Sequence, residues 1–289
     1  MGEMPSETVN TNHPEVNMMT IRCAALSVLA IGAAASIGTA RADKLVLGNE
    51  GSYPPFSITD ASGRVTGAEP EIAREMCKRM NAECEIVAMD FKALIPALLQ
   101  GKIDAIATQI KPLPERKERA LFGIPIVYNP DAYVIPADKD YAFTKEGLKG
   151  LKFGLQRGSA QSKYVAEKFG DAVEIVFYDN PDQIRLDLLN KRVDLTLGPR
   201  INWSIELVAK PEGKGWKLAG GEIWTGDASI PEAERGSSWI VRKDSQPLLD
   251  RMNTALKAMI ADCTFTQIRA KFIPAAIVPG ESVCVEKKS

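Results

Sequence analysis

The side chains that most often carry out catalysis are sparse in this chain. Its one histidine, His13, lies near the N-terminus, ahead of the long apolar run. Without an imidazole, the rest of the chain cannot form a Ser-His-Asp triad, a Cys-His pair or a histidine metal site. Catalysis would have to rest on carboxylate, Lys, Tyr or Arg side chains, which favours binding over catalysis without excluding an enzyme.

The N-terminus has the pattern of a secretory signal peptide. Arg22 precedes a 16-residue apolar run over residues 23–38, and the Ala-Arg-Ala cleavage pattern at residues 40–42 follows it. The run is short and rich in Ala and Gly for a membrane span. We expect translation to start at Met18 or Met19 and the mature protein to be periplasmic. The alternative is an uncleaved N-terminal anchor.

Export changes the expected role of the cysteines. Four of them, Cys77, Cys84, Cys263 and Cys284, follow the cleavage site. An even number in an oxidising compartment suggests disulfides, although four cysteines allow three pairings. Sequence proximity favours Cys77–Cys84 and Cys263–Cys284. A metal site is the alternative, but no C-x-x-C spacing supports it, and we expect neither a metal nor a cofactor.

Composition indicates a soluble globular protein. The 289 residues are 45% hydrophobic and 25% charged, with a formal net charge of −1. This length suits one or two domains, each with its own core. Because no basic face is implied, nucleic acid and anionic membrane surfaces are poor candidate partners.

Strand-like and helical segments alternate along the chain, which predicts the α/β class. In the first half, strands are predicted at residues 44–48, 84–88 and 103–108, and helices at 69–80, 91–99 and 114–119. After Pro136 the pattern restarts, with strands at 152–155, 173–178 and 193–197 and helices at 160–169 and 181–189. A strand at 238–241 and a helix at 247–261 follow, and polar or Gly-rich residues at 210–221 and 225–235 predict loops. Two similar lobes are the natural interpretation.

Six motifs in the same order carry a resemblance to a known family. They are LVLGNEGSYPPF (45–56), ALIPALLQGKIDAIAT (93–108), PERKERALF (114–122), LKGLKFGLQRGSAQ (148–161), LLNKRVDLTLG (188–198) and the segment from WIVRKDSQPLL to QIRAKF (239–272). Together they resemble the bacterial extracellular solute-binding proteins of family 3, the periplasmic amino-acid- and opine-binding components of ABC importers. Each motif alone is weak, whereas six in order are specific.

The resemblance implies a type II periplasmic-binding-protein fold, in which two Rossmann-like lobes joined by a two-strand hinge close over a small ligand. After a leader at 1–42, lobe 1 would comprise 43–131 plus 236–289, and lobe 2 would comprise 132–235. It also implies a monomer that delivers an amino acid or derivative to a membrane permease. The pair Cys77 and Cys84 is similar to a disulfide of the cationic amino-acid branch.

The resemblance also assigns site residues in the first lobe. Arg116 corresponds to the residue that holds the ligand's α-carboxylate, a task suited to the planar guanidinium fork. Thr108 and Gln109 fall where the family places hydroxyl and backbone donors. Tyr53 and Phe91 match positions that sandwich the ligand side chain. The alternatives are a surface arginine in a charged helix and ordinary core aromatic residues.

Further site residues lie at Glu50 and in the second lobe. Glu50 matches an acidic position that contacts a cationic side chain, its alternative being a solvated carboxylate at the end of a strand. Gln156, Ser159 and Gln161 lie with Arg157 on a predicted strand-to-helix turn. A helix N-terminus offers free N–H groups to a carboxylate.

Two positions depart from the family pattern. Pro199 replaces an Asp that holds the ligand's α-ammonium, and Lys111 replaces a hydroxyl residue near the carboxylate pocket. The alternative for Lys111 is a surface lysine whose head reaches water. Together the two departures favour a ligand with extra negative charge and a substituted or absent primary amine, such as an opine-like conjugate.

Two other function classes compete with the binding protein. The first is a periplasmic dehydratase acting on arogenate or prephenate on the same scaffold, for which Glu50 could supply the general acid and Pro199 could not. The second is a sensory module fused to a membrane signalling domain. The sequence carries no second apolar span that would favour it.

Overall fold

A computed structural model describes residues 43–278, Glu281 and Cys284. The predicted leader and its cleavage site lie outside the described residues. Within the described part of the chain, none of the helices combines the length and apolarity needed to cross a bilayer.

The first lobe is built on a five-stranded sheet with the order β5-β1-β6-β13-β7. Its strands are β1 (Asp43–Asn49), β5 (Ala82–Ala88), β6 (Ala105–Ile110), β7 (Ala120–Val127) and β13 (Ser237–Arg242). Strand β1 pairs in parallel with β5 and β6, whereas β13 runs antiparallel to β6 and β7. The last strand in the sequence, β13, therefore belongs to the sheet of the first lobe.

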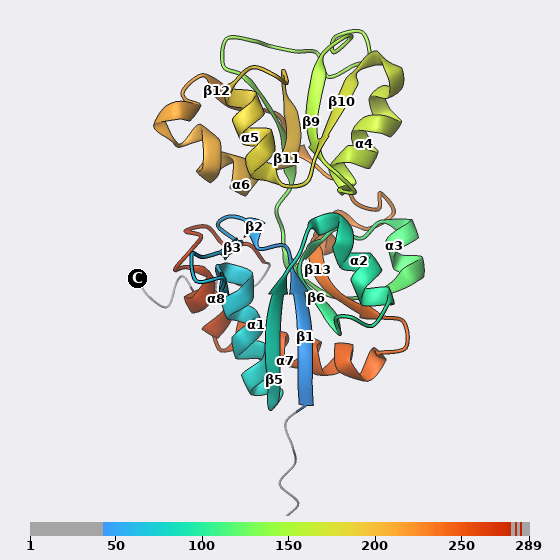
Figure 1. The fold of residues 1–289 in the computed structure, drawn as a ribbon, viewed down its shortest axis with the longest axis vertical. Coiled ribbons are helices and arrows are strands. Elements are labelled where there is room, and N and C mark those ends of the chain that lie inside the picture. The colour runs from blue at the N-terminus through green and yellow to red at the C-terminus, as the bar shows by residue number, and fades with distance from the viewer. Residues whose placement is uncertain (1–42, 279–280, 282–283, 285–289) are drawn as a thin grey trace, which may run out of the picture. The chain divides into compact units, whose positions relative to one another are not determined.

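Helices cover both faces of this sheet (Figure 1). They are α1 (Ala68–Arg79), α2 (Phe91–Leu99), α3 (Pro114–Arg119), α7 (Gln246–Ala261) and α8 (Thr264–Arg269). Because successive strand residues point to opposite faces, Leu47 packs in the core beneath α1 and α7, whereas Val46 packs with α2. The strands consequently read as continuous apolar runs, as expected for a sheet buried on both sides.

The second lobe contains a parallel pair, β9 (Lys152–Gln156) with β10 (Glu174–Tyr178), and a three-stranded sheet of order β11-β8-β12. The latter strands are β8 (Asp131–Pro136), β11 (Thr196–Pro199) and β12 (Trp216–Ile223). A parallel bridge between Phe153 and Leu195 joins the two groups. Helix α4 (Ala160–Phe169) packs in the core on one face, and α5 (Pro181–Leu189) and α6 (Arg200–Trp203) on the other (Figure 1).

Short elements complete the chain. They are β2 (Ser52–Tyr53), β3 (Ser57–Thr59) and β4 (Val65–Thr66), the 3-10 turns Gly170–Ala172, Pro211–Gly213 and Glu232–Glu234, and a π-helical turn at Ser204–Val208. Strands β2, β3 and β4 form a small antiparallel sheet. Its first strand carries Tyr53, which is buried.

The chain passes between the two sheets twice, between Val127 and Asp131 and again between Ile223 and Ser237. We propose that the lobes divide at 131/132 and 235/236, beside these two crossings. The side chain of Asn129 bonds the first crossing to α6: it donates to Asn202 Oδ1 at 3.0 Å and accepts from the Ile201 amide at 3.0 Å.

One predicted loop is wrong. Residues 210–221 were expected to be irregular, yet Trp216–Ile223 forms β12 and pairs with β8. Strand pairing tolerates the two glycines because they form a bulge: the register shifts between Ala219 and Ile223, and Gly220 and Gly221 have φ values of 80° and 72°. A glycine pair therefore marks an irregularity inside a strand here.

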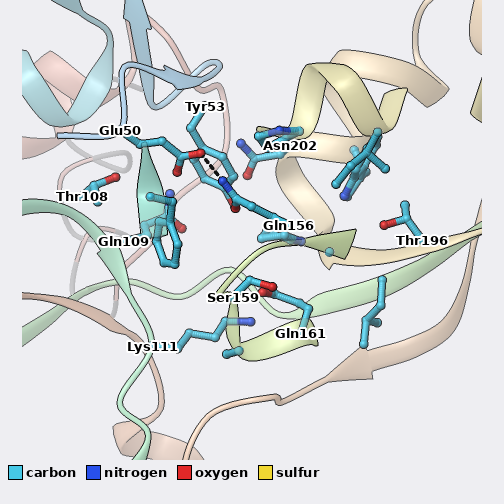
Figure 2. A pocket seen from close by; sticks show the side chains of 18 of the residues that line it. Glu50, Tyr53, Thr108, Gln109, Lys111, Gln156, Ser159, Gln161, Thr196 and Asn202 are labelled. Atoms are coloured by element: carbon cyan, nitrogen blue, oxygen red, sulfur yellow. Dashed lines mark hydrogen bonds between the residues drawn. The ribbon is translucent and has the colours of Figure 1, made fainter. Parts of the chain in front are cut away.

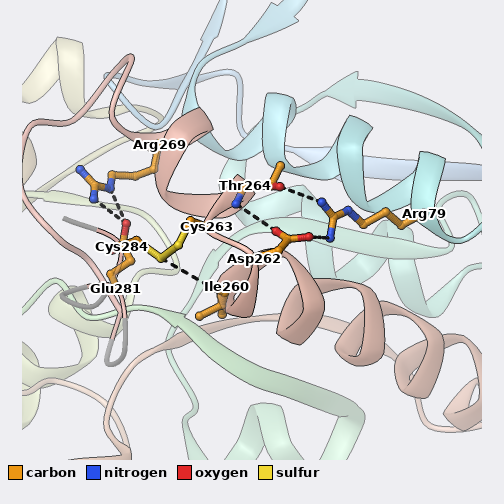
Figure 3. Close-up of a disulfide and its surroundings, with 8 residues drawn as sticks. All are labelled: Arg79, Ile260, Asp262, Cys263, Thr264, Arg269, Glu281 and Cys284. Atoms are coloured by element: carbon orange, nitrogen blue, oxygen red, sulfur yellow. Dashed lines mark hydrogen bonds and ion pairs between the residues drawn. A yellow bond between two sulfur atoms is a disulfide. The ribbon is translucent and has the colours of Figure 1, made fainter. Parts of the chain in front are cut away.

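Both disulfides favoured by sequence proximity are present. Cys77 on α1 is bonded to Cys84 on β5, and Cys263 at the start of α8 is bonded to Cys284 (Figure 3). Arg269 and Glu281 form a buried ion pair near the second bond, with Arg269 Nε donating to Glu281 Oε1 at 2.7 Å. Cys284 and Glu281 are thus tied to α8, the first by a covalent bond and the second by an ion pair.

Candidate functional site

A pocket lies where the carboxyl ends of several strands meet, lined by residues of both sheets. It encloses about 880 Å³ of space free of protein atoms, part of it open to solvent. All eleven predicted ligand residues line it: Glu50, Tyr53, Phe91, Thr108, Gln109, Lys111, Arg116, Gln156, Ser159, Gln161 and Pro199. The carboxyl ends of strands are where open α/β sheets bind ligands. Figure 2 shows many of these side chains pointing toward a common space.

Arg116 supplies a buried cation at one end of the pocket. It lies on α3, which Pro114 starts at its first turn, and its side chain is 6% exposed. Nη1 donates to the Lys111 carbonyl at 2.9 Å and Nη2 to the Gly158 carbonyl at 2.8 Å. Burial lowers the pKa of Arg116 to about 10, so the group remains a cation. Among the described residues no carboxylate forms an ion pair with it.

The two aromatic residues have different surroundings. Phe91 opens α2 and lies under the guanidinium, with Arg116 Cζ 5.7 Å from its ring centroid. Tyr53 is buried on β2 and tilts against Phe56, with their ring centroids 6.0 Å apart. Phe91 therefore supports Arg116 as well as facing the pocket.

Glu50 forms an acidic end of the site. It follows β1, is 5% exposed, and accepts a hydrogen bond from Gln156 Nε2 at 2.5 Å (Figure 2). This bond joins the two lobes. Burial raises the pKa of Glu50 from its ordinary value to about 7; Gln156 opposes that shift and Asp90 adds to it.

Thr108 and Gln109 lie on β6 and line the same pocket. Thr108 Oγ1 donates to Glu69 Oε2 at 3.0 Å, and burial raises the pKa of Glu69 to about 8, against the effect of that hydrogen bond. The side-chain nitrogen of Gln109 is buried and has no hydrogen-bond partner within the described residues. Glu69, 2% exposed on α1, was missed by sequence reasoning because it acts behind the pocket wall.

The second lobe contributes the turn between β9 and α4. Ser159 caps α4 by accepting from the Ser162 amide at 3.1 Å, and Gly158 has a φ of 75°, which permits the turn. Gln156 and Ser159 reach the pocket from this turn. Arg157 does not line the pocket; its guanidinium lies over Phe177, with Cζ 5.3 Å from the ring centroid.

Lys111 is a buried residue of the pocket and not a surface lysine. Its side chain is 7% exposed, and Nζ pairs with Asp131 and donates to Thr225 Oγ1 at 3.2 Å. Burial lowers the pKa of Lys111, Asp131 opposes that shift, and Arg116 adds to it. Gln161 Nε2 donates to the other oxygen of Asp131 at 2.7 Å. Asp131 and Thr225 were missed, because their contacts with Lys111 join distant parts of the chain.

The wall around Pro199 includes residues that no motif indicated. Pro199 ends β11 and lies opposite Asp131 in the strand register. Asn202 and Trp203 follow on α6, and Asn202 Nδ2 donates to the Pro54 carbonyl of the first lobe at 2.7 Å. Asp182, Arg185 and Glu206 also line the pocket. In the described part of the chain, no cluster of His, Cys, Asp and Glu is suited to a metal ion.

Comparison with known proteins gives the family. A model of the bacterial extracellular solute-binding proteins, family 3, matches residues 45–275. The chain belongs to this family. It is 32% identical over 250 residues to the L-arginine-binding protein of Pseudomonas aeruginosa, covering 86% of this chain and 93% of that protein. It is also 32% identical over 255 residues to the lysine/arginine/ornithine-binding periplasmic protein of Escherichia coli, covering 86% and 95%.

A solved structure agrees with this assignment. An ancestral arginine-binding protein bound to arginine superposes with a TM-score of 0.71 at 30% identity, covering 80% of this chain and 99% of that one. The family and the type II two-lobed fold predicted from the motifs are therefore confirmed. All three of these relatives are binding proteins.

Proposed function

We propose that this protein is the periplasmic substrate-binding component of an ABC importer. It captures an amino acid or an amino-acid derivative between its lobes and delivers it, as a monomer, to a membrane permease without chemical change. Membership of solute-binding family 3 and similarity to arginine- and lysine-binding relatives support this proposal. An exported chain with a cleaved leader is part of the same proposal.

The observation that carries the proposal is Arg116. A buried guanidinium without a carboxylate partner is costly, because burial removes its hydration. Two carbonyl oxygens satisfy only part of its five-donor fork. A ligand carboxylate would supply the missing charge and accept two parallel hydrogen bonds. The α4 N-terminus, capped by Ser159, lines the same pocket and favours the same anion.

Thermal unfolding of the ligand-free mature protein tests the proposal. The panel contains amino acids, opine-like conjugates, polyamines and aromatic precursors. A ligand present at 1,000 times its Kd should stabilise the folded state by about 4 kcal/mol. For a chain of this size the midpoint should rise by roughly 8 to 16 °C. A shift with polyamines and none with carboxylates would contradict the proposal.

Replacing Arg116 by lysine tests its role directly. Arg116→Lys keeps the charge and loses the fork, so the Kd for a carboxylate ligand should rise roughly 10- to 100-fold. Isothermal titration calorimetry measures this change. Arg119→Lys is the matched control, because Arg119 is an exposed residue of the same helix outside the pocket. Equal affinities of the two variants would rule out the proposed carboxylate contact.

Glu50 is the reason to test catalysis as well. A buried carboxyl group with a pKa near 7 in a pocket has the properties that a general acid requires. We expect no turnover of prephenate or arogenate at high protein concentration. Product formation that depends on Glu50, lost in Glu50→Gln, would favour the dehydratase over the transporter component.

A further inference from the structure

The oxygen acceptors next to Pro199 are already occupied by the protein. Asp131 is fully buried and lies opposite Pro199 in the strand register. One carboxylate oxygen accepts from Lys111 Nζ and from Thr225 Oγ1, the latter at 2.7 Å. The other accepts from Gln161 Nε2 at 2.7 Å. Three of the roughly four acceptor sites of the Asp131 carboxylate are therefore used within the protein, and the residue is fully buried.

Lys111 faces the pocket as a donor. An ammonium group has three N–H donors, and two of them go to Asp131 and Thr225. Among the described residues the third has no acceptor, and Lys111 lines the pocket. Figure 2 shows its side chain extending toward the segment that carries Ser159 and Gln161. A ligand oxygen is the group that this third donor can bind.

The neighbouring side chains add further donors. The Gln109 side-chain nitrogen is buried without a partner in the described structure, and Arg116 keeps N–H groups beyond the two given to carbonyls. Two cations, Arg116 and Lys111, line the pocket, and among the described residues only Lys111 pairs with a carboxylate, that of Asp131. This end of the pocket is rich in donors and positively charged.

A free ammonium at this end would meet Lys111 directly. Two like charges at contact distance repel, and they repel more strongly in a buried pocket than in water. A ligand oxygen at the same place would instead accept a charge-assisted hydrogen bond. The difference in charge favours oxygen over nitrogen.

We infer that the ligand places a second oxygen acceptor, and no free primary ammonium, beside the carboxylate held by Arg116. The inference rests on the proposed function and narrows its substrate class. Two sources supply this chemistry. One is a 2-hydroxy or 2-keto acid. The other is an amino acid whose nitrogen, still cationic, carries a carboxyalkyl group, and the added carboxylate supplies the oxygen acceptor and offsets the charge of the nitrogen. Lys111, held by Asp131 and Thr225, is the residue that determines this specificity.

Matched ligand series test the inference. Each series keeps one side chain and varies the group on the α-carbon: the free amino acid, its 2-hydroxy acid and its N-(1-carboxyethyl) derivative. Guanidino, carboxylate and apolar side chains give three series. In the series that binds most tightly, calorimetry should give a Kd at least 10-fold lower for one of the oxygen-bearing ligands than for the free amino acid. Whichever of the two analogues, the 2-hydroxy acid or the N-(1-carboxyethyl) derivative, binds more tightly identifies the class of ligand.

Two variants should reverse this preference. Lys111→Ser removes the ammonium and the hydrogen bond that it donates to Asp131. Pro199→Asp adds a carboxylate at the strand position opposite Asp131. Each should tighten binding of the free amino acid and weaken binding of its 2-hydroxy acid by about 10-fold. Lys102→Ser, at an exposed position outside the pocket, should leave both affinities unchanged. Pro199→Asp keeps the test valid if Lys111→Ser fails to fold.

Different results would contradict the inference and the proposed function. If the free amino acid binds as tightly as both analogues in its series, the inference is overturned and the transport function stands. If no carboxylate in any series binds, both are overturned.

Discussion

At the residue scale, two buried carboxyl groups set the pH behaviour of the pocket. Glu50 lies in its wall and Glu69 behind it, bonded to Thr108. Burial raises the pKa of Glu50 to about 7 and that of Glu69 to about 8. Each carboxyl group also raises the pKa of neighbouring groups through its charge: Glu50 does so for Glu69. The ligand-free pocket therefore holds protons that the unfolded chain would release.

Replacing Glu50 by glutamine should stabilise the ligand-free protein at alkaline pH. Between about pH 4.5 and pH 7 the unfolded chain has lost this proton and the folded chain retains it, so stability falls as pH rises. Glutamine removes this loss and can still accept from Gln156. We expect Glu50→Gln to gain about 3 kcal/mol over the wild type between pH 4 and pH 8, measured by urea unfolding.

The exposed position Glu83 supplies the control for this measurement. Glu83→Gln should show the same pH dependence of unfolding as the wild type. Should Glu50→Gln and Glu83→Gln give parallel curves, Glu50 would ionise in the folded protein near its ordinary pKa.

At the element scale, the sequence predicted the elements that depend on local patterns better than the strands that depend on long-range pairing. Helices α2, α4 and α5 begin and end where the sequence predicts, because their apolar spacing is a local signal, and because Ser159 caps α4 and Asn180 caps α5. Strands β7 and β8 were not predicted. Their register is set by partners far along the chain, β13 for the first and β11 and β12 for the second.

The same distinction holds for the site. The eleven predicted residues were assigned by position against the family pattern, as matches or as departures, and all of them line one pocket. Asp131, Thr225 and Glu69 could not be found that way. Each acts through a contact to a residue distant in sequence: Asp131 and Thr225 contact Lys111, and Glu69 contacts Thr108. Their chemistry appears only when separate elements have packed.

The C-terminal segment gives a prediction about α8. Figure 3 shows the ion pair of Arg269, which is 1% exposed, with Glu281, which is fully buried. Glu281 also accepts from the Ile277 amide at 2.6 Å. Arg269→Met would leave Glu281 charged and unpaired, so we expect a loss of about 3 to 5 kcal/mol in urea unfolding. Adding Glu281→Gln should restore more than half of this loss, because glutamine keeps an acceptor without the charge.

An exposed pair provides the comparison for this double-mutant cycle. Arg251 pairs with Asp43 at 2.5 Å with both side chains over 40% exposed, so Arg251→Met should cost less than about 1 kcal/mol. A cost of Arg269→Met as small as that of Arg251→Met would mean that the Cys263–Cys284 bond alone holds the segment.

At the scale of the whole molecule, ion pairs join the lobes outside the ligand pocket. Lys92 Nζ lies 2.6 Å from Asp179, and Lys163 Nζ lies 2.7 Å from Glu115. Each pair joins one residue of the first lobe to one of the second, and all four side chains are 40–46% exposed. Such pairs contribute up to about 1 kcal/mol each and are screened by salt. They stabilise the arrangement in which the lobes meet over the pocket.

The ligand contacts both lobes only when they meet over the pocket. Removing both ion pairs should therefore weaken ligand binding, and the effect should depend on salt. We expect the double variant Lys92→Met/Lys163→Met to raise the Kd of the ligand found by thermal unfolding roughly 3- to 10-fold at low ionic strength, and less than about 2-fold at 0.5 M NaCl. The double variant Lys44→Met/Lys152→Met, which removes pairs within single lobes, should bind like the wild type at both salt concentrations. A loss of affinity that salt does not change would show that Lys92 and Lys163 act through packing of their aliphatic stems rather than through charge.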